Sequence, residues 1–418
     1  MSLMPCHRCA IVIEMLTSGP TGRTRVVAAL GITQTIAWGS SYYLPAMLAE
    51  PMAREVGVST PTVFLAFSIA LVVSALIGPT AGAAIDRWDG RAVLLATNLV
   101  FAAALLALAT VQGPAGLFVA WGVLGIGMGS GLYEAAFATA VRLYGHESRG
   151  PITGFTLIAG FTSTVAWPLS TWLELHVGWR GACMTWAALH LLVALPLNAG
   201  LPRPASRVAA PAEPAGATDS SADAAPEPDA GLRTAVLLSF VFAVTWFTST
   251  AMASHLPRLL QAGGVSLTTA VLLGSLIGPA QVAGRLAEFG FLRRAHPMLS
   301  ARLAAVTHPV GAIAFMVFGA PAAAAFVCLH GLGNGILTIA KGTLPLVLFG
   351  PVGYGRRQGV LMVPARVAQA AAPWLFGIAL DRVGAGALWF TSAIGVAALV
   401  ALLALRAPVV PSGAARRR

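Results

Sequence analysis

Charged residues are scarce in this sequence. Asp, Glu, Lys and Arg make up 10% of the 418 residues, whereas 57% are hydrophobic. Soluble globular chains carry about 25% charged residues, so this composition excludes a soluble protein and indicates one that lies in the lipid bilayer. The formal net charge of +11 does not indicate nucleic-acid binding, because no soluble domain is present to display a basic patch.

Lysine and cysteine are rarer still. Lys341 is the only lysine among 26 basic residues, and there are four cysteines. Cys183 and Cys328 lie in apolar runs and are interpreted as core residues. The segment Cys6–Cys9 offers two cysteines and one histidine, whereas a structural zinc site needs four ligands. We therefore predict no metal site, and no motif predicts a cofactor.

Long hydrophobic runs dominate the rest of the chain. A membrane-spanning helix needs about 20 apolar residues, and twelve such runs can be placed. The sequence therefore predicts an all-α membrane protein with 12 transmembrane helices. The runs are approximately 25–48, 61–82, 92–112, 116–141, 151–172, 179–200, 233–256, 268–290, 301–320, 322–349, 358–380 and 385–407.

A polar segment rich in Ala and Pro separates the sixth run from the seventh. It holds five acidic residues and almost no large apolar ones, so it is predicted to be a disordered linker. The predicted organisation is an N-terminal cytoplasmic extension (1–24), a six-helix half (25–200), the cytoplasmic linker (201–232), a second six-helix half (233–407) and a basic cytoplasmic tail (408–418).

The basic residues are unevenly distributed between the loops. With the twelve runs in place, 19 of the 26 fall on one side of the membrane, four on the other and three within helices. Cytoplasmic loops of membrane proteins are enriched in Lys and Arg. We therefore predict that both termini lie in the cytoplasm and that the protein resides in a bacterial inner membrane.

The two predicted halves repeat one another. The tetrapeptide LIGP at Leu76–Pro79 recurs 200 positions later, at Leu276–Pro279. Three further residues recur at a common offset of 205 positions: Gly145, Gly154 and Pro168 match Gly350, Gly359 and Pro373. A shared offset at equivalent helix positions predicts two pseudo-symmetric halves.

A charged turn joins the second and third runs. It reads GPTAGAAIDRWDGR over residues 78–91. The pattern G-x-x-x-D-R followed by G-R resembles the loop 2–3 signature of the major facilitator superfamily, from which it departs by the extra Asp89. An ordinary charged turn that holds a helical hairpin on the correct side is the alternative. The residues that carry the resemblance to a gating loop are Asp86, Arg87 and Arg91.

The resemblance covers about residues 25–407. It implies a secondary transporter that moves a small molecule by alternating access between two six-helix halves, and we expect a monomer. It also implies that Asp86 contacts the start of the eleventh helix, near Gln358, and controls switching. No nucleotide-binding loop or hydrolase motif occurs in the sequence, so neither an ATP-driven pump nor an enzyme is predicted. The alternative from another class is a non-transporting membrane sensor.

Polar and aromatic side chains concentrate on four of the runs. In the superfamily, the first, fourth, seventh and tenth helices line the central cavity. On this resemblance, the substrate-binding candidates include Gln34, Trp38, Trp246 and Asn334. The alternative is that such residues hydrogen-bond between helices or anchor them at the membrane surface.

Four ionisable side chains lie inside predicted spans: Glu134, Arg285, Lys341 and Arg366. Each costs roughly 2.5–3.5 kcal/mol on insertion scales, so each requires a partner or a function. One interpretation is a gate of ion pairs at the cytoplasmic end, in which Arg285 pairs with Glu288. The other is a substrate or coupling site, in which Glu134 carries the proton if transport is coupled to protons.

The eighth run adds a hint about the substrate. Its Gln281-x-x-x-Arg285 resembles the Asp-x-x-x-Arg pair of monocarboxylate transporters of the superfamily, whose arginine binds the substrate carboxylate. The stretch YEAAF at 133–137 resembles a bacterial monocarboxylate-porter-like branch, some members of which export arsenite and antimonials. We therefore predict that a small organic anion or oxyanion binds Gln281, Arg285 and Arg366. A drug or metalloid efflux pump of the same fold is the alternative.

Overall fold

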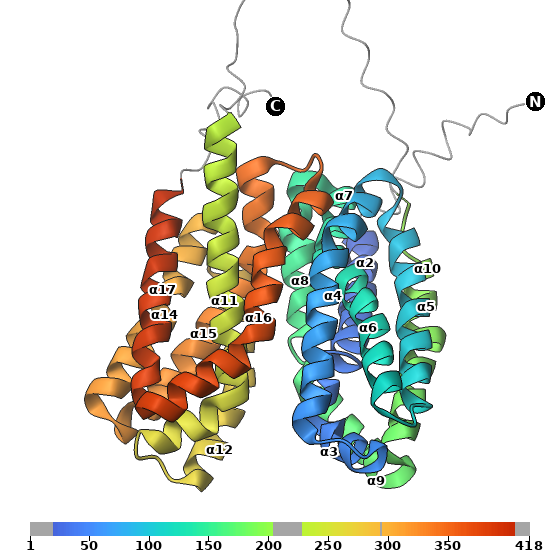
Figure 1. Ribbon diagram of the computed structural model, residues 1–418. Helices are drawn as coiled ribbons and strands as arrows, with labels where there is room; N and C mark the ends of the chain where they lie inside the picture. The colour runs from blue at the N-terminus through green and yellow to red at the C-terminus, as the bar shows by residue number, and fades with distance from the viewer. Residues whose placement is uncertain (1–19, 204–227, 293–294, 406–418) are drawn as a thin grey trace, which may run out of the picture.

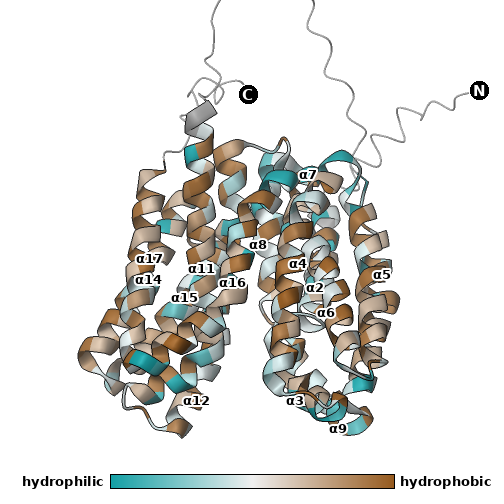
Figure 2. Cartoon of the chain, in the orientation of Figure 1, coloured by the Kyte–Doolittle hydropathy of each residue, from teal (hydrophilic) through white to brown (hydrophobic). Residues whose placement is uncertain are grey.

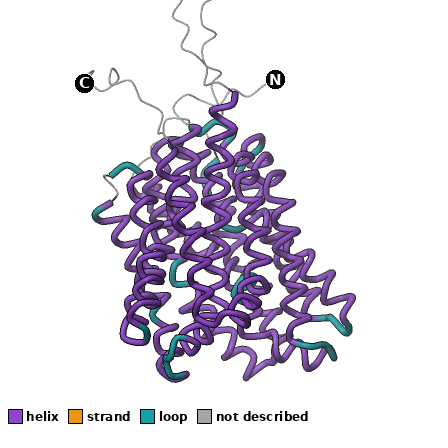
Figure 3. Tube along the Cα trace, turned by 60° about the vertical axis from the view of Figure 1, so that its left-hand side comes forward, coloured by secondary structure: helices purple, strands orange, loops and turns teal. Residues whose placement is uncertain are grey.

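The computed structural model describes residues 20–203, 228–292 and 295–405. Helices make up most of these ranges, and the described chain contains no strand (Figure 3). The all-α prediction is confirmed. The predictions for the N-terminal extension and the linker fall largely outside the described residues, and the prediction for the basic tail lies wholly outside them.

The first group of helices precedes the linker. We call it the N-terminal half. It also contains a short 3₁₀ turn, Gly145–Ser148, and a π-helical turn, His190–Ala194. Its α-helices are α2 (Pro20–Gly39), α3 (Leu44–Val56), α4 (Thr60–Arg87), α5 (Gly90–Ala109), α6 (Pro114–Gly131), α7 (Tyr133–Tyr144), α8 (Arg149–Ala159), α9 (Thr162–Leu189) and α10 (Leu195–Ala199).

The second group follows the linker and is called the C-terminal half. Two 3₁₀ turns, Ala320–Ala322 and Gly384–Gly386, lie between its helices. The α-helices are α11 (Pro228–Ala262), α12 (Leu267–Ser275), α13 (Ile277–Gly290), α14 (Pro297–Phe318), α15 (Ala323–Phe349), α16 (Tyr354–Val383) and α17 (Ala387–Ala404).

Eight stretches of the described chain are long and apolar enough to cross a membrane. Two of them are long enough to cross more than once: Pro114–Ala199 has 86 residues and Tyr354–Ala404 has 51, against about 20 for one crossing. The chain reverses within α9 at Gly178, where φ is +71°, and between α16 and α17 at Gly384, where φ is +54°. Together with α2, these stretches are consistent with twelve crossings.

Several spans that the hydropathy predicts as continuous are broken in the structure. The first run, 25–48, is interrupted between α2 and α3. Pro45 lies in the first turn of α3, and proline has no N–H with which to continue a preceding helix. The fourth run, 116–141, is divided at Leu132, whose backbone is extended. Hydropathy alone cannot locate such breaks, because an interrupted helix keeps its apolar residues.

The two halves lie side by side (Figure 1). Helices α4 and α16 meet at one end of the molecule, where α4 ends and α16 begins. We call this end the terminal face and the other end the opposite face. The most extensive contacts between the two halves are made by the pairs α4–α16, α7–α16, α7–α15, α8–α13 and α8–α15.

The outer surface of the bundle is hydrophobic (Figure 2). Large apolar side chains project from it, including Leu76 (69% exposed), Leu175 (73%) and Leu192 (76%). Soluble monomers rarely expose contiguous apolar surface on this scale. Lipid tails cover such a surface without penalty, so the structure is that of an integral membrane protein.

The internal repeat is visible in matching helix starts. Helix α4 begins after Ser59, whose hydroxyl accepts a hydrogen bond from the backbone N–H of Thr62. Helix α12 begins after Ser266, whose hydroxyl accepts from the N–H of Thr269. Both serines fill the N-cap position, where serine satisfies backbone donors that the helix leaves unpaired.

Glycines allow α4 and α16 to touch backbone to backbone. A Cβ atom added at Gly82 would lie 2.0 Å from the carbonyl oxygen of Gly355, and one added at Gly359 would lie 2.5 Å from that of Gly78. Both distances are far below van der Waals contact. Small residues at helix interfaces permit this close approach in membranes, and here they close the two halves together near the terminal face.

Candidate functional site

Asp86 joins the two halves at the terminal face. Its Oδ1 and Oδ2 accept hydrogen bonds of 2.8 Å each from the backbone N–H groups of Gly355 and Arg356, at the start of α16. A carboxylate is stabilised there by the unpaired N–H groups and by the positive end of the helix dipole. The contact expected at the start of the eleventh helix is therefore present, about one turn before Gln358.

Two other charged residues of the predicted gating loop, Asp89 and Arg91, make contacts on the N-terminal side of the molecule, whereas Arg87 is exposed. Asp89 caps α5 by accepting from the backbone N–H of Arg91 at 3.0 Å. The Arg91 guanidinium donates to the Leu201 carbonyl at 3.4 Å. The residue by which this loop departs from the superfamily signature is thus the N-cap of the next helix.

A second connection at the terminal face was not predicted from the sequence. Arg149, the first residue of α8, forms a 2.7 Å ion pair with the buried Glu288 of α13. The same guanidinium donates to the carbonyls of Leu292 and Ala295 beyond the end of α13. A cation is favoured at a helix C-terminus for the same reason that a carboxylate is favoured at an N-terminus. Glu288 therefore pairs with Arg149, and the Arg285–Glu288 pair is absent from the ion pairs of the described residues.

The break between α6 and α7 lies in the middle of the bundle. The Gln34 side chain donates to the Gly131 carbonyl at 2.8 Å, which satisfies an acceptor at the end of α6. Its Oε1 atom is buried without a hydrogen-bond partner among the described residues. Glu134 lies in the first turn of α7, where the helix dipole favours a negative charge.

Glu134 pairs with Arg366 across the interface between the halves. The Arg366 guanidinium donates from Nη2 to Glu134 Oε2 at 2.8 Å and from Nη1 to Gln369 Oε1 at 2.9 Å. Arg366 is 2% exposed. The pair borders a small pocket between α4, α6, α7 and α16. Its lining residues are Ser74, Ala75, Gly78, Gly129, Glu134, Gly359, Met362 and Arg366.

Aromatic side chains from both halves meet beside this ion pair. The Trp38 and Trp246 rings are stacked, with centroids 5.9 Å apart and planes 9° from parallel. Tyr133 packs on the other side of Trp38 at 4.9 Å. Tyr42 shares a 3.3 Å hydrogen bond with Thr250 across the interface. The indole N–H groups of both tryptophans are buried and lack a hydrogen-bond partner within the described chain.

Two cationic side chains lie beside the stacked tryptophans. The Lys341 ammonium lies 3.9 Å from the centroid of Trp246, and the Arg366 guanidinium lies 5.1 Å from the same centroid. These are cation–π distances. The structure thus brings Trp38, Trp246, Glu134, Lys341 and Arg366 into one cluster, which we call the central cluster.

Arg285 of α13 lies next to this cluster. Its guanidinium packs against Gly160 of α8, where an added Cβ would be 2.0 Å from Nη1. It is near enough for its charge to act on Tyr133 and Lys341. The residue is 5% exposed, yet its Nε and Nη1 atoms have no hydrogen-bond partner in the parts of the chain that the structure describes.

Two other candidates make contacts within the C-terminal half. Asn334 donates to Ser249 of α11 at 3.0 Å, which is the interhelical bond that the alternative interpretation expected. The backbone of Gln281 packs under Gly335 of α15, where an added Cβ would be 2.1 Å from the Gln281 carbonyl oxygen. Glycine therefore brings α13 against α15 and places Arg285, one turn later, near the interface.

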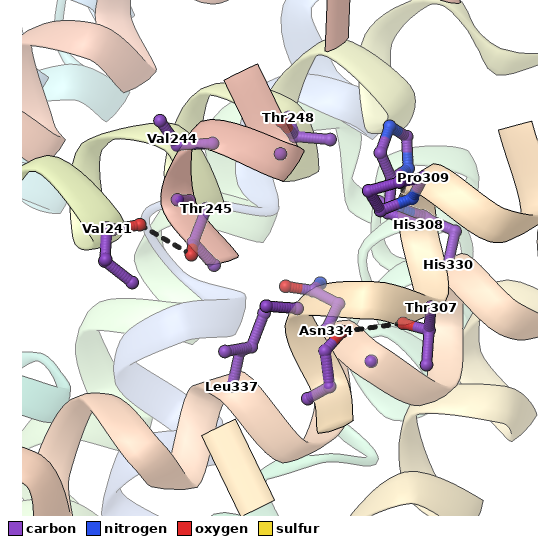
Figure 4. Close-up of a pocket in the computed structure, with 15 residues that line it drawn as sticks. Val241, Val244, Thr245, Thr248, Thr307, His308, Pro309, His330, Asn334 and Leu337 are labelled. Atoms are coloured by element: carbon purple, nitrogen blue, oxygen red, sulfur yellow. Dashed lines mark hydrogen bonds between the residues drawn. The ribbon is translucent and has the colours of Figure 1, made fainter. Parts of the chain in front are cut away.

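A separate pocket lies inside the C-terminal half, between α11, α14, α15 and α17 (Figure 4). His308 and His330 line it with their Nδ1 atoms 3.0 Å apart, so one of these nitrogens carries a hydrogen and the other accepts it. No Asp, Glu, Lys or Arg side chain lines this pocket, which distinguishes it from the central cluster.

The comparison with protein families decides the class of protein. Residues 30–340 match the family described as Major Facilitator Superfamily. The chain belongs to the Major Facilitator Superfamily. It is therefore a membrane transporter, and the resemblance of the 78–91 loop to this superfamily is confirmed. The monocarboxylate-porter-like branch stays a prediction.

A protein of Thermoproteus tenax, described as an uncharacterized 38 kDa protein in the 23S RNA operon, is 29% identical over 370 residues, which cover 86% of this chain and 90% of the relative.

Solved structures show the same fold. The human organic anion transporter MFSD10 (TETRAN) has a TM-score of 0.69 at 16% identity, covering 91% of this chain and 99% of that one. The proton:xylose symporter XylE bound to 6-bromo-6-deoxy-D-glucose has a TM-score of 0.70 at 12% identity, covering 90% and 94%. FucP in the outward conformation has a TM-score of 0.68 at 14% identity, covering 90% and 97%. At these identities the likeness shows the fold alone.

Proposed function

We propose that this transporter moves a small organic anion or oxyanion by alternating access. The observation that carries the proposal is Arg285, a buried guanidinium with two nitrogens that lack a partner. Leaving a charged donor buried and unpaired is costly, whereas a bound carboxylate or oxyanion satisfies it through charge-assisted, often bidentate, hydrogen bonds. The anion would be the missing partner.

The charges around Arg285 support an anionic substrate. Arg366 already pairs with Glu134, so that pair contributes no net charge. Arg285 then leaves an excess positive charge at a buried position between the halves, and Lys341 adds a second one when it carries its proton. The unpaired indole N–H groups of Trp38 and Trp246 add two neutral donors. A donor-rich, positively charged site favours an anion over a cationic drug, which is the substrate class of the alternative efflux pump.

Alternating access requires the terminal-face contacts to break and reform. Asp86 and Arg149 each join one half to a helix terminus of the other. Hydrogen bonds to charged groups contribute about 1.5–3 kcal/mol each. This is enough to favour the state with a closed terminal face and small enough for ligand binding to reverse that preference. Asp86 is therefore proposed to control switching, and Arg149 to act on the other side of the same interface.

The test is uptake into proteoliposomes that contain the purified transporter. Radiolabelled lactate, benzoate, succinate and arsenite would be compared, with the variant Arg285→Lys measured beside the wild type. Lysine keeps the charge but loses the planar pair of donors, so we expect a rise of at least tenfold in the KM of the transported anion.

Arg25→Lys is the matched control, because Arg25 is exposed near the start of α2 and the substitution is the same. It should transport as the wild type does. If Arg285→Lys also retains the wild-type KM for every anion that the wild type carries, the role of Arg285 is refuted. Uptake of only uncharged solutes by the wild type would refute the anion proposal as a whole.

A further inference from the structure

Lys341 occupies an unusual position for the only lysine of a chain with 26 basic residues. It is 5% exposed, in the middle of α15, and faces the interface between the halves. Elsewhere the chain uses arginine for every basic position, both on the surface and in ion pairs. Guanidinium remains charged under all physiological conditions, whereas an ammonium group can release its proton when it is buried.

The groups around Lys341 leave its ammonium without a fixed anionic partner. Its closest recorded contact is with the Trp246 ring at 3.9 Å, and no ion pair of the described residues includes it. Glu134, the nearest carboxylate in the cluster, is engaged by Arg366 at 2.8 Å. Arg285 and Arg366 both act on Lys341 as like charges.

Polar groups on other helices packed against α15 form hydrogen bonds or ion pairs of their own. On α16, Tyr354 donates to the Gly342 carbonyl and Gln358 to that of Lys341 itself. On α14, His308 is bonded to His330, and on α8, Arg149 is bonded to Glu288. The charged groups that determine the state of Lys341 are therefore Glu134, Arg285 and Arg366.

This arrangement makes the charge of Lys341 depend on whether an anion is present. Without an anion, burial and the Arg285 guanidinium favour the neutral amine, whereas the opposite charges of Glu134 and Arg366 largely cancel because the two side chains are paired. A bound anion adds a negative charge at short range and favours the ammonium form. Binding of the anion and binding of the proton then reinforce each other equally, because linkage between two ligands is reciprocal.

We propose that Lys341 is the proton-binding group of this transporter and that it takes up one proton with each anion. The inference rests on the proposed anion transport. The only chemical change is transfer of a proton from water to the Lys341 amine, and the reverse when the anion leaves. Both ligands are carried in the same direction, so a monovalent anion is moved without net charge.

The geometry favours Lys341 over Glu134 for this role. The Glu134 carboxylate accepts a charge-assisted hydrogen bond from Arg366, so it already has a cationic partner. Glu134 and Arg366 thereby act as a positioning pair within the cluster. Lys341 is the remaining member whose charge can change.

The first experiment uses the single lysine as a built-in probe. Growth of cells on lysine labelled with ¹³C and ¹⁵N labels one side chain of the full-length transporter, purified with a lysine-free tag. The Cε chemical shift of Lys341 reports whether the amine carries its proton. We expect it to change between about pH 6 and 9, the range in which a proton carrier has to exchange its proton. A signal that stays at the ammonium position through this range overturns the inference.

The second experiment measures binding of benzoate and lactate by calorimetry over the same pH range. Both acids are fully ionised there, because carboxylic acids titrate near pH 4, so a pH dependence belongs to the protein. Once the pH within this range exceeds the point at which Lys341 of the anion-free protein loses its proton, the wild-type Kd should rise by up to about tenfold per pH unit, as expected for one linked proton.

Two variants separate the possible outcomes. Lys341→Arg keeps a permanent charge, so its Kd should change by less than about twofold over the range. In Glu134→Gln the Kd should change with pH as steeply as in the wild type, even where the affinity itself differs. If Lys341→Arg keeps the wild-type slope, or Glu134→Gln abolishes it, Lys341 is not the proton site. If neither anion binds at any pH, the proposed function fails for these anions, while the labelled-lysine experiment still decides the state of Lys341.

Discussion

The connection between Asp86 and the start of α16 makes a quantitative prediction about switching. Asp86→Asn replaces one carboxylate oxygen with an amide group that cannot accept a hydrogen bond. The variant therefore loses at least one of the two 2.8 Å bonds to Gly355 and Arg356, and it also loses the charge that faces the helix dipole.

The expected size of the effect follows from these two losses. A hydrogen bond to a charged group contributes about 1.5–3 kcal/mol, and a charge at a helix end contributes about 0.3–1 kcal/mol. Asp86 is only half-buried, so solvent reduces both contributions and leaves about 1–2 kcal/mol. This changes the ratio of closed to open terminal face by about 5–30-fold.

The assay is a distance measurement between spin labels on the two halves at the terminal face. Trp88 and Val352 are both 66% exposed, and they lie at the end of α4 and just before α16. In a background with the four native cysteines replaced, labels at these two positions should show a larger population of long distances in Asp86→Asn. Transport rates should fall, while the amount of protein in the membrane should stay the same.

Asp89→Asn is the matched control. It makes the same substitution three residues away, at a cap that lies wholly within the N-terminal half, and asparagine is as good an N-cap as aspartate. Its distance distribution should match that of the wild type. The reasoning is refuted if Asp86→Asn leaves the distribution unchanged, or if Asp89→Asn alters it to the same extent.

Three further predictions follow from other contacts. Gly82→Ala places a Cβ 2.0 Å from the Gly355 carbonyl oxygen and should open the terminal face by about 1–3 kcal/mol in the same distance assay, whereas Gly122→Ala, with nothing within 4 Å, should not. The pKa of Glu55 is lowered from 4.5 by hydrogen bonds from its ion-pair partner on α9 and from a neighbouring tryptophan. Its contribution to stability is therefore present above pH 4.5 and lost as the pH falls through the lowered value, so the melting temperatures of the wild type and Glu55→Gln should converge in acid. Reporters fused within residues 201–232 should be found on the cytoplasmic side of the membrane. A linker that is accessible from outside would refute the predicted topology.

The sequence alone was sufficient for the architecture. Apolar runs of membrane-spanning length predict an all-α membrane protein, the repeat at offsets of 200 and 205 positions predicts two similar halves, and the 78–91 loop resembles the signature of the superfamily. The contact of Asp86 with the start of α16 could also be predicted, because the superfamily loop implied it. The membrane-spanning helices can be recognised from the sequence because helix formation and membrane insertion depend on the composition of a single stretch.

Only the tertiary structure decided which charges are paired. From the sequence, Arg285 could pair with Glu288, and Glu134 had three possible cationic partners. In the structure, Glu288 pairs with Arg149, and Glu134 pairs with Arg366. Each of these pairs joins residues more than 130 positions apart, on different halves. An ion pair requires atoms within about 4 Å, and such distances depend on how the halves pack, which no local pattern records. The same packing leaves two nitrogens of Arg285 without a hydrogen-bond partner among the described residues and places Lys341 against Trp246, and these two facts carry the functional proposals.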